Sequence, residues 1–437
     1  MRFAGRVRGV VKPVVRWGVQ HGLPRAALLA AARRGDPQAR LFVASNELPT
    51  GALSGLFDEI RGGGPLVEGA FSKVTASHAV VREVLTSNDF RSGIGAGTGV
   101  LARLAEWSAP EALHPMVRPS LLVAEPPDHT RYRRLVTGVF TARAVEGLRG
   151  LAERTAHELL DALDPRRPVD LAGTYCALLP VTMISEVLGV PPEQRRRVLE
   201  LGAAAAPSLD TGLSWGRFRR VDAALVAFDA WLAEHLGRLR ARPGEDLLSR
   251  LVAAREDGVG LSEVELRATA GLVLAAGFET TVNLLGNGIA LLHDHPGQLA
   301  VVRRDPARWS NAVEEVLRVD PPVLLTGRTC VRDTEVAGVP VAAGSLVTAV
   351  LAGANRDPLV FGDPGRFDVC RVNAREHIAF SAGRHHCLGA ALARLEGEVG
   401  LRVLFERFPG LRLLPGAVHR STRVLRGYER LPAVLGG

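Results

Sequence analysis

The spacing of apolar residues predicts a mainly helical chain. From Pro127 to about Leu317, most apolar residues recur three and four positions apart, which is typical of helices with one buried face. A shorter segment from Ser77 to Leu85 and a last one from about Gly389 to Phe405 have the same spacing. The apolar face of the last segment consists of Leu388, Leu392, Leu395, Val399 and Val403.

One of these segments is predicted to be a long helix at the centre of the protein. Ser262 and Glu265 have the spacing of a capping box, which marks the start of a helix. From Ala268 to Leu292 the only charged residue is Glu279. The stretch is long enough to cross a bilayer, but threonines and asparagines interrupt it. We therefore expect it in the core of a large protein.

Short β segments are expected in two places. Pro65 to Thr75 has apolar residues interrupted by Gly and Ser, and Val323 to Val350 is β-branched with Gly-containing breaks. Between them, Gly93 to Gly99 holds four glycines that do not fit GxGxxG spacing, so it is interpreted as a mobile loop. The predicted fold class is mainly α with a minor β portion.

No linker, repeat or low-complexity run divides the 437 residues, so a single large domain is expected. We predict residues 1–60 to be an N-terminal arm of the same unit and residues 61–437 to be its main body. The arm is basic and lacks the compact apolar region of a signal peptide. It is either a membrane-surface helix or, as we favour, an arm lying on the domain. No transmembrane anchor is expected.

The net charge of +8 comes almost entirely from arginine, since Lys12 and Lys73 are the only lysines. The arginines are spread along the chain, without zinc-finger spacing or stacked aromatic residues, so we expect no nucleic-acid partner. Four separated cysteines without a CxxC motif indicate reduced thiols and a cytoplasmic protein.

Cys387 is the cysteine with a chemical context. It lies in Phe380-Ser-Ala-Gly-Arg-His-His-Cys-Leu-Gly389, between a glycine-containing loop and the start of the last helix. Unpaired backbone N–H groups at a helix start favour thiolate over thiol. A zinc site with His385 and His386 is the alternative, but no second Cys/His cluster stands nearby. Cys176, Cys330 and Cys370 are interpreted as inert.

This loop resembles the haem loop of the cytochrome P450 family. Phe380, Gly383, His385, Cys387 and Gly389 fill the family pattern in order, although position 381, often Gly, is Ser here. The resemblance covers about Pro65 to Pro432. It implies the cytochrome P450 fold, with a haem b between the long central helix and the cysteine-bearing helix, and Cys387 as the sulfur ligand of the iron.

Glu279 and Thr280 in the central helix match the acid–alcohol pair of the family. A lone carboxylate in an apolar helix is costly unless it is paired or hydrated. One interpretation is a buried Glu279 that a neighbour satisfies, with Thr280 bonding back to the helix. The other, which the resemblance supports, is a local opening of the helix where Thr280 hydrogen-bonds dioxygen and Glu279 relays protons.

Four residues are predicted to hold the haem propionates. His129 and Arg133 lie four positions apart at a helix start, where two cations repel unless an anion lies between them. The resemblance gives this pair to the propionates, together with Arg328 and His385. It also implies that Glu315 and Arg318 form a buried structural pair, joined by Arg371.

The resemblance implies a monooxygenase that inserts one atom of dioxygen into a hydrophobic substrate of lipid, steroid, terpene or polyketide type. The predicted substrate contacts are residues 91–118, residues 206–218, Ala275, Ala276 and residues 323–325. No flavin or nicotinamide site is visible, so a ferredoxin-type donor and its reductase are expected. Plausible docking charges are Arg131, Arg134, Arg384 and Arg394, although ordinary surface arginines fit equally well.

Three other functions stay open on the sequence. The first is a haem-binding sensor without turnover, and the second is a peroxide-driven oxidase or phenol-coupling enzyme on the same fold. The third is a basic binding protein without haem.

Overall fold

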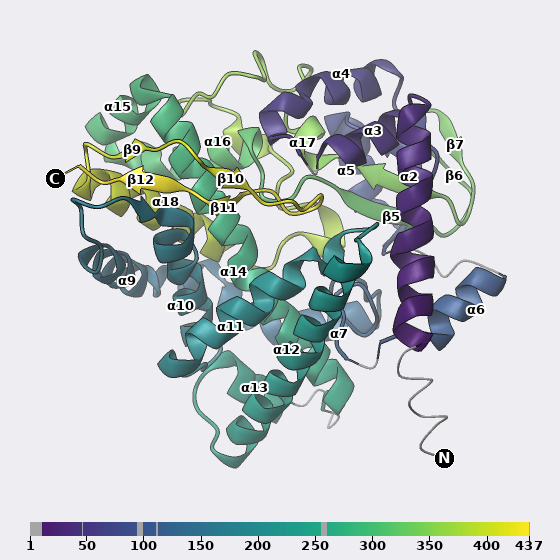
Figure 1. Cartoon of the computed structure of the whole chain (residues 1–437), viewed down its shortest axis with the longest axis horizontal. Coiled ribbons are helices and arrows are strands. Elements are labelled where there is room, and N and C mark those ends of the chain that lie inside the picture. Colours follow the sequence, from purple (N-terminus) through teal and green to yellow (C-terminus); the bar gives the residue numbers. More distant parts are fainter. Residues whose placement is uncertain (1–10, 46, 94–98, 111, 255–259, 437) are drawn as a thin grey trace.

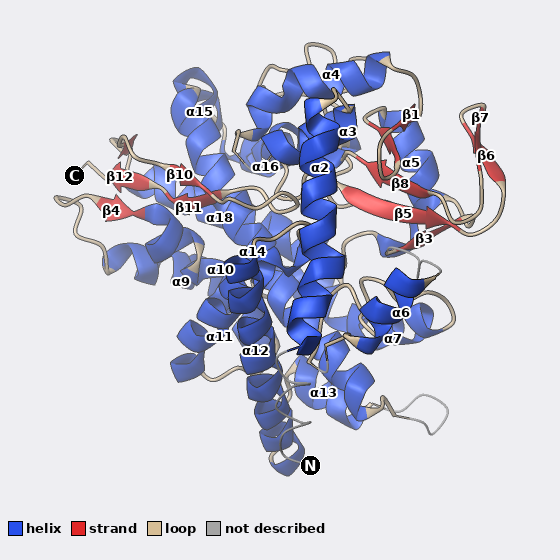
Figure 2. Ribbon diagram, turned by 45° about the vertical axis from the view of Figure 1, so that its right-hand side comes forward, coloured by secondary structure: helices blue, strands red, loops and turns tan. Residues whose placement is uncertain are grey.

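The computed structural model describes residues 11–45, 47–93, 99–110, 112–254 and 260–436. The predicted glycine loop lies mostly outside them, since only Gly93 and Gly99 of that segment are described. The fold is mainly helical with a minor β portion, as predicted (Figure 2).

The helices are α2 (Leu23–Arg33), α3 (Pro37–Ala44), α4 (Ser54–Gly62), α5 (His78–Thr86), α6 (Val100–Trp107), α7 (Asp128–Thr137), α8 (Ala142–Glu146), α9 (Arg149–Asp161), α10 (Leu178–Val187), α11 (Pro192–Ala205), α12 (Trp215–Ala241), α13 (Leu247–Ala253), α14 (Glu263–Asp294), α15 (Pro296–Arg304), α16 (Trp309–Val319), α17 (Leu351–Ala354) and α18 (Ala390–Arg407). The strands are β1 (Val67–Glu68), β2 (Lys73–Thr75), β3 (Phe90–Ser92), β4 (Val169–Asp170), β5 (Thr326–Cys330), β6 (Thr334–Val336), β7 (Val339–Val341), β8 (Leu346–Ala349), β9 (Arg412–Leu413), β10 (Val418–His419), β11 (Tyr428–Arg430) and β12 (Pro432–Val434).

Helix α14 runs through the middle of the helical part (Figure 1). Ser262 and Glu265 form the predicted capping box at its start. It packs against α10 and α18, and most of its apolar stretch is buried inside the protein. By length and composition it could cross a membrane, but its burial identifies it as a core helix, as predicted.

The largest sheet contains segments from both ends of the chain. Its strand order is β1-β2-β8-β5-β3, with β2 and β8 parallel and the other pairs antiparallel. The sequence predicted strands in both regions but did not predict that β3 pairs with β5. That pairing brings Ser92 opposite Arg328, which matters for the site below.

The N-terminal residues 11–60 pack onto the rest of the chain. Residues 11–33 are helical throughout, with a π-helical turn, η1 (Gly18–Gly22), before α2. Leu41, Leu53 and Phe57 are fully buried in a cluster that also contains Val74 and Leu324. The described part of the arm therefore shares a hydrophobic core with the main body.

Candidate functional site

The loop before α18 presents Cys387. The Cys387 N–H donates to the Phe380 carbonyl at 2.9 Å, which closes the loop on itself. Gly383 has a φ of +68°, and a Cβ there would lie 2.4 Å from the Leu85 carbonyl oxygen at the end of α5. Only glycine therefore allows this approach. Ser381, where the family often has glycine, has a φ of 61°, and its buried hydroxyl has no partner among the described residues.

The surroundings of Cys387 act on its ionisation in two directions. The Gly389 N–H, Arg133 and Arg394 favour the thiolate, as predicted for a helix start. Burial acts against them and is the larger effect, so it raises the pKa of the thiol above the ordinary value. A cation bound at the sulfur would favour the thiolate further.

Two histidines and an arginine meet beside the loop. His129 and Arg133 lie on α7, as the sequence predicted. The His129 and His385 rings are 4.5 Å apart, and the Arg133 guanidinium donates to the His386 carbonyl at 2.7 Å. His129 is 3% exposed, and its Nε2 has no partner among the described residues. Burial and the charge of Arg133 lower the pKa of His129.

Arg328 on β5 lies near His385. It is 4% exposed, and its guanidinium donates only to the Thr326 hydroxyl and the Gly327 carbonyl. None of the described carboxylates forms an ion pair with it, and burial lowers its pKa to about 10. A buried arginine without a carboxylate is costly, which indicates that an anion binds here.

Glu125 was not singled out from the sequence. It is 7% exposed and accepts from the Ser92 N–H and from Arg384, both at 2.8 Å. His385 Nε2 lies 3.4 Å from its other oxygen. Although burial acts to raise its pKa, these three partners hold the pKa below the ordinary value. Glu125 thus anchors His385 and Arg384 but leaves Arg328 and Arg133 unneutralised.

The haem that the sequence implies fits these residues. Its two propionates are anionic, and these residues offer donors without an acidic partner among the described residues: the buried Arg328 and His129, and the partly buried Arg133. Gly389, two residues after Cys387, leaves open space where a Cβ would stand. No group of three or more His, Cys, Asp or Glu residues in the described part of the chain forms a metal site, which disfavours the zinc alternative.

Helix α14 carries Glu279 and Thr280, which line a cavity that is described below. Glu279 is 4% exposed and forms an ion pair with Arg420 at 2.7 Å. Burial raises its pKa, and Arg420 acts to lower it. The Thr280 hydroxyl donates to the Ala276 carbonyl at 3.2 Å. Helix α14 is continuous here, so the predicted local opening is not observed, and the satisfied-neighbour interpretation describes this structure.

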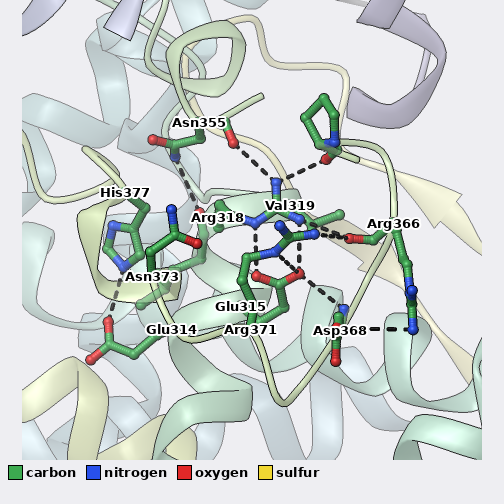
Figure 3. A network of polar contacts seen from close by, with 12 residues as sticks. Glu314, Glu315, Arg318, Val319, Asn355, Arg366, Asp368, Arg371, Asn373 and His377 are labelled. Carbon is green, nitrogen blue, oxygen red and sulfur yellow. Dashed lines mark hydrogen bonds and ion pairs between the residues drawn. The ribbon is translucent and has the colours of Figure 1, made fainter. Parts of the chain in front are cut away.

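A buried ion cluster joins α16 to the chain that precedes the cysteine loop (Figure 3). Arg318 makes two bonds to Glu315, at 2.7 and 2.8 Å, and both side chains are fully buried. Arg371 reaches the same carboxylate at 3.1 Å, as the resemblance implied. Arg318 also donates to the Asn355 carbonyl, and the Asn355 side chain accepts from the Ile378 N–H. The cluster therefore fixes the segment that leads into the loop.

The arginines proposed for docking are largely occupied within the chain. Arg131 pairs with Glu265, Arg384 with Glu125, and Arg394 with Glu314. Glu314 also accepts from His377 at 3.0 Å, and the Arg394 guanidinium lies 4.6 Å from the centre of the Phe380 ring. These contacts favour the interpretation of ordinary structural arginines.

A cavity of about 700 Å³ lies against the exposed side of Ala276 and Thr280. All the segments predicted to contact substrate contribute to its lining, and most of the lining is apolar. The sequence did not predict the contributions of the N-terminal arm or of the chain near the C-terminus, because nothing local marks them. These additional lining residues include Pro24, Leu28, Phe42, Phe71, Leu346 and residues 423–425.

Comparisons with known proteins identify relatives of this chain. The family model described as "Cytochrome P450" matches residues 309–412. A protein of Mycobacterium tuberculosis named "Putative cytochrome P450 140" is 50% identical over 98% of both chains. The 6-deoxyerythronolide B hydroxylase of Saccharopolyspora erythraea is 39% identical over 75% of this chain and 81% of its own. A crystal structure of Mycobacterium smegmatis CYP164A2 superposes with a TM-score of 0.79 at 35% identity, covering 90% of this chain and 99% of that one.

Proposed function

Because the chain belongs to the cytochrome P450 family and is therefore a haem-thiolate monooxygenase, we propose that Cys387 is the sulfur ligand of its haem iron. The observation that carries this assignment is the buried Arg328, which has no ion-pair partner among the described carboxylates, together with the partly buried Arg133 and the unpartnered His129 Nε2 beside the cysteine loop. Of the four cysteines, Cys387 is the one that lies within electrostatic reach of this group, through Arg133.

We assign the propionates to His129, Arg133, Arg328 and His385. Arg133 and Arg328 would supply charge, and the unpartnered His129 Nε2 would supply a hydrogen bond. His385 would be oriented by Glu125. Bound haem would supply the activation of dioxygen, which a thiolate ligand to the iron promotes.

Thr280 and Glu279 are proposed to deliver protons to the cavity. The Thr280 hydroxyl lines the cavity and can exchange its bond to the Ala276 carbonyl for one to a molecule in the cavity. Glu279 is adjacent, and burial raises the pKa of its carboxyl, which favours the protonated form that a proton donor needs. Arg420 would hold the Glu279 carboxylate in place between transfers.

The substrate is proposed to be a large, mainly apolar molecule of lipid, steroid, terpene or polyketide type. The cavity volume of about 700 Å³ is in the range of pockets that enclose such ligands. One relative is named as a hydroxylase of 6-deoxyerythronolide B, which is in keeping with a bulky substrate.

Electrons are proposed to come from a ferredoxin-type protein and its reductase, in the cytoplasm. The support for this is the family and the net positive charge of +8, which attracts an acidic partner. The arginines near the loop that already form ion pairs within the chain add little support for this partner.

The assignment is tested with the carbon monoxide complex of the reduced protein. We expect the absorbance maximum of a thiolate-ligated haem, and Cys387→Ala should abolish it. Cys330→Ala and Cys370→Ala are matched controls, because both thiols lie away from the pocket, and they should keep the maximum. The assignment is wrong if Cys387→Ala keeps the maximum, or if either control loses it while remaining folded.

A further inference from the structure

The N-terminal helix forms part of the cavity wall. Pro24 and Leu28 of α2 line the cavity, and Leu28 is 6% exposed. Its neighbour Leu29 is 38% exposed and does not line the cavity. In both ribbon views α2 stands between α12 and α6 (Figures 1 and 2). The helix therefore presents a defined side chain to the space that substrate would occupy.

One side of the helical segment formed by residues 11–33 contacts residues 206–222, which we call the roof segment. The Trp17 Nε1–H donates to the Leu213 carbonyl at 2.9 Å, and Arg25 donates to the Gly212 carbonyl at 3.2 Å. Arg16 forms an ion pair with Asp222. The roof segment itself contributes Ala206, Ser208, Leu209 and Thr211 to the cavity lining.

Aromatic packing strengthens the same edge. The Trp17 ring meets the Trp215 ring edge-on at 5.6 Å, and the His21 ring lies 5.4 Å from the Phe218 ring. Arg16 also stands over the Phe218 ring at 5.3 Å. Contacts of this kind add to the area that is buried between two elements.

The same helical segment also contacts α6 and the chain that follows it. The Lys12 ammonium lies 5.7 Å from the centre of the Trp107 ring at the end of α6. His114, which lines the cavity, lies within electrostatic reach of Arg16 and His21. The helical segment thus contacts the roof segment and lies near His114, and both contribute to the cavity lining.

The π turn makes these contacts compatible. In η1 the Leu23 N–H donates to the Gly18 carbonyl, five residues earlier. A Cβ at Gly22 would lie 3.2 Å from the Trp17 ring, so the ring packs against the bare backbone of the next turn. π turns inside helices often mark functional positions. Here the turn connects the part that holds the roof segment to the part that lines the cavity.

We propose that residues 11–33 belong to the substrate site, with Leu28 determining specificity and Trp17 holding the roof segment over the cavity. This inference rests on the proposed function, since it takes the cavity to be the substrate cavity.

The role of Leu28 is tested by ligand titration of the haem-loaded protein. The probes are 1-phenylimidazole, which is small, and miconazole, which fills more of the cavity, and the readout is the shift of the haem spectrum. Leu28→Trp should weaken miconazole by about ten-fold relative to 1-phenylimidazole. Leu29→Trp is the matched control and should leave the ratio of the two dissociation constants unchanged. An unchanged ratio in Leu28→Trp overturns the assignment.

The role of Trp17 is tested by hydrogen exchange of the roof segment in the same protein. Trp17→Phe removes the donor to Leu213 but keeps a ring, and should speed exchange there by about five-fold. Trp231→Phe loses a comparable bond, from Nε1 to Gln194, and should not change exchange in the roof segment. Equal exchange in wild type and Trp17→Phe overturns the role. If wild type lacks the thiolate spectrum, the proposed function fails instead.

Discussion

At the scale of single residues, the cysteine loop has two left-handed backbone positions, one favourable for its residue and one costly. Gly383 has the conformation and the close contact that require glycine. Ser381 has a left-handed backbone as well, with a side chain that gains no hydrogen bond within the described structure. The loop is therefore held in place by its surroundings at a local cost in free energy.

Ser381→Gly should raise the free energy of unfolding by about 1 kcal/mol, because it relieves the left-handed conformation and removes the buried hydroxyl. Urea denaturation measures this. Ser381→Ala separates the two causes, since it removes the hydroxyl but keeps the strained backbone. A glycine variant no more stable than the alanine variant would mean that the backbone at this position carries no strain.

Thr280→Ala should lower the amount of product formed per dioxygen consumed by about ten- to a hundred-fold, because it removes the hydroxyl that is proposed to deliver protons. Peroxide release and product are measured together. Thr174→Ala is the control, since Thr174 bonds back to the Asp170 carbonyl in the same way but does not line the cavity. Full activity of Thr280→Ala would favour the peroxide-driven alternative.

Residues in local motifs could be predicted from the sequence, and their distant partners could not. Cys387, His129 and Arg133 stand in recognisable spacings, and the structure brings them together. Glu125 and Arg420 are single charged residues in a chain with many, and only the fold brings Arg420 to Glu279. Arg328 was the least specific of the predicted propionate residues, and its burial makes it the most informative.

At the scale of elements, the ion cluster joins α16 to the loops before the cysteine. The three charged groups of Glu315, Arg318 and Arg371 are nearly or fully buried, and their hydrogen bonds extend to the backbone at residues 355–368. Charges buried in this way are costly to separate, so the elements they connect are expected to open together.

Glu315→Gln should lower the free energy of unfolding by about 3–5 kcal/mol, because it strands two buried guanidinium groups. Urea denaturation and the fraction of haem retained measure the effect. The control is Glu200→Gln, which breaks the exposed pair with Arg196 and should cost below about 0.5 kcal/mol. A loss in Glu315→Gln as small as in the control would contradict the role of the cluster.

Element types were easier to predict than their pairings. The capping box and the long apolar stretch of α14 are local, and both predictions are confirmed, since the helix begins with that box and is mostly buried. The pairing of β3 with β5 joins residues more than two hundred positions apart, for which no local signal exists. The contact of α2 with the roof segment is of the same kind.

At the scale of the whole molecule, the net charge of +8 governs encounters with other proteins. Many of the arginines are paired on the surface, so a partner meets a diffuse positive field more than a set of free side chains.

Raising the salt concentration from about 50 to about 500 mM should slow reduction by an acidic ferredoxin by about ten-fold or more, because it shortens the range of this field. Stopped-flow reduction measures the rate. Reduction by dithionite is the control for effects of salt on the protein itself. A rate with ferredoxin that does not depend on salt would argue against electrostatic recognition.

The residues that line the cavity and those of the ion cluster do not overlap: neither Glu315, Arg318 nor Arg371 borders the cavity. Substitutions that change substrate preference can therefore accumulate among the cavity residues while the ion cluster continues to support the haem-binding loop. For directed evolution, libraries confined to positions such as 28, 113, 116 and 209 should retain most of their coloured members.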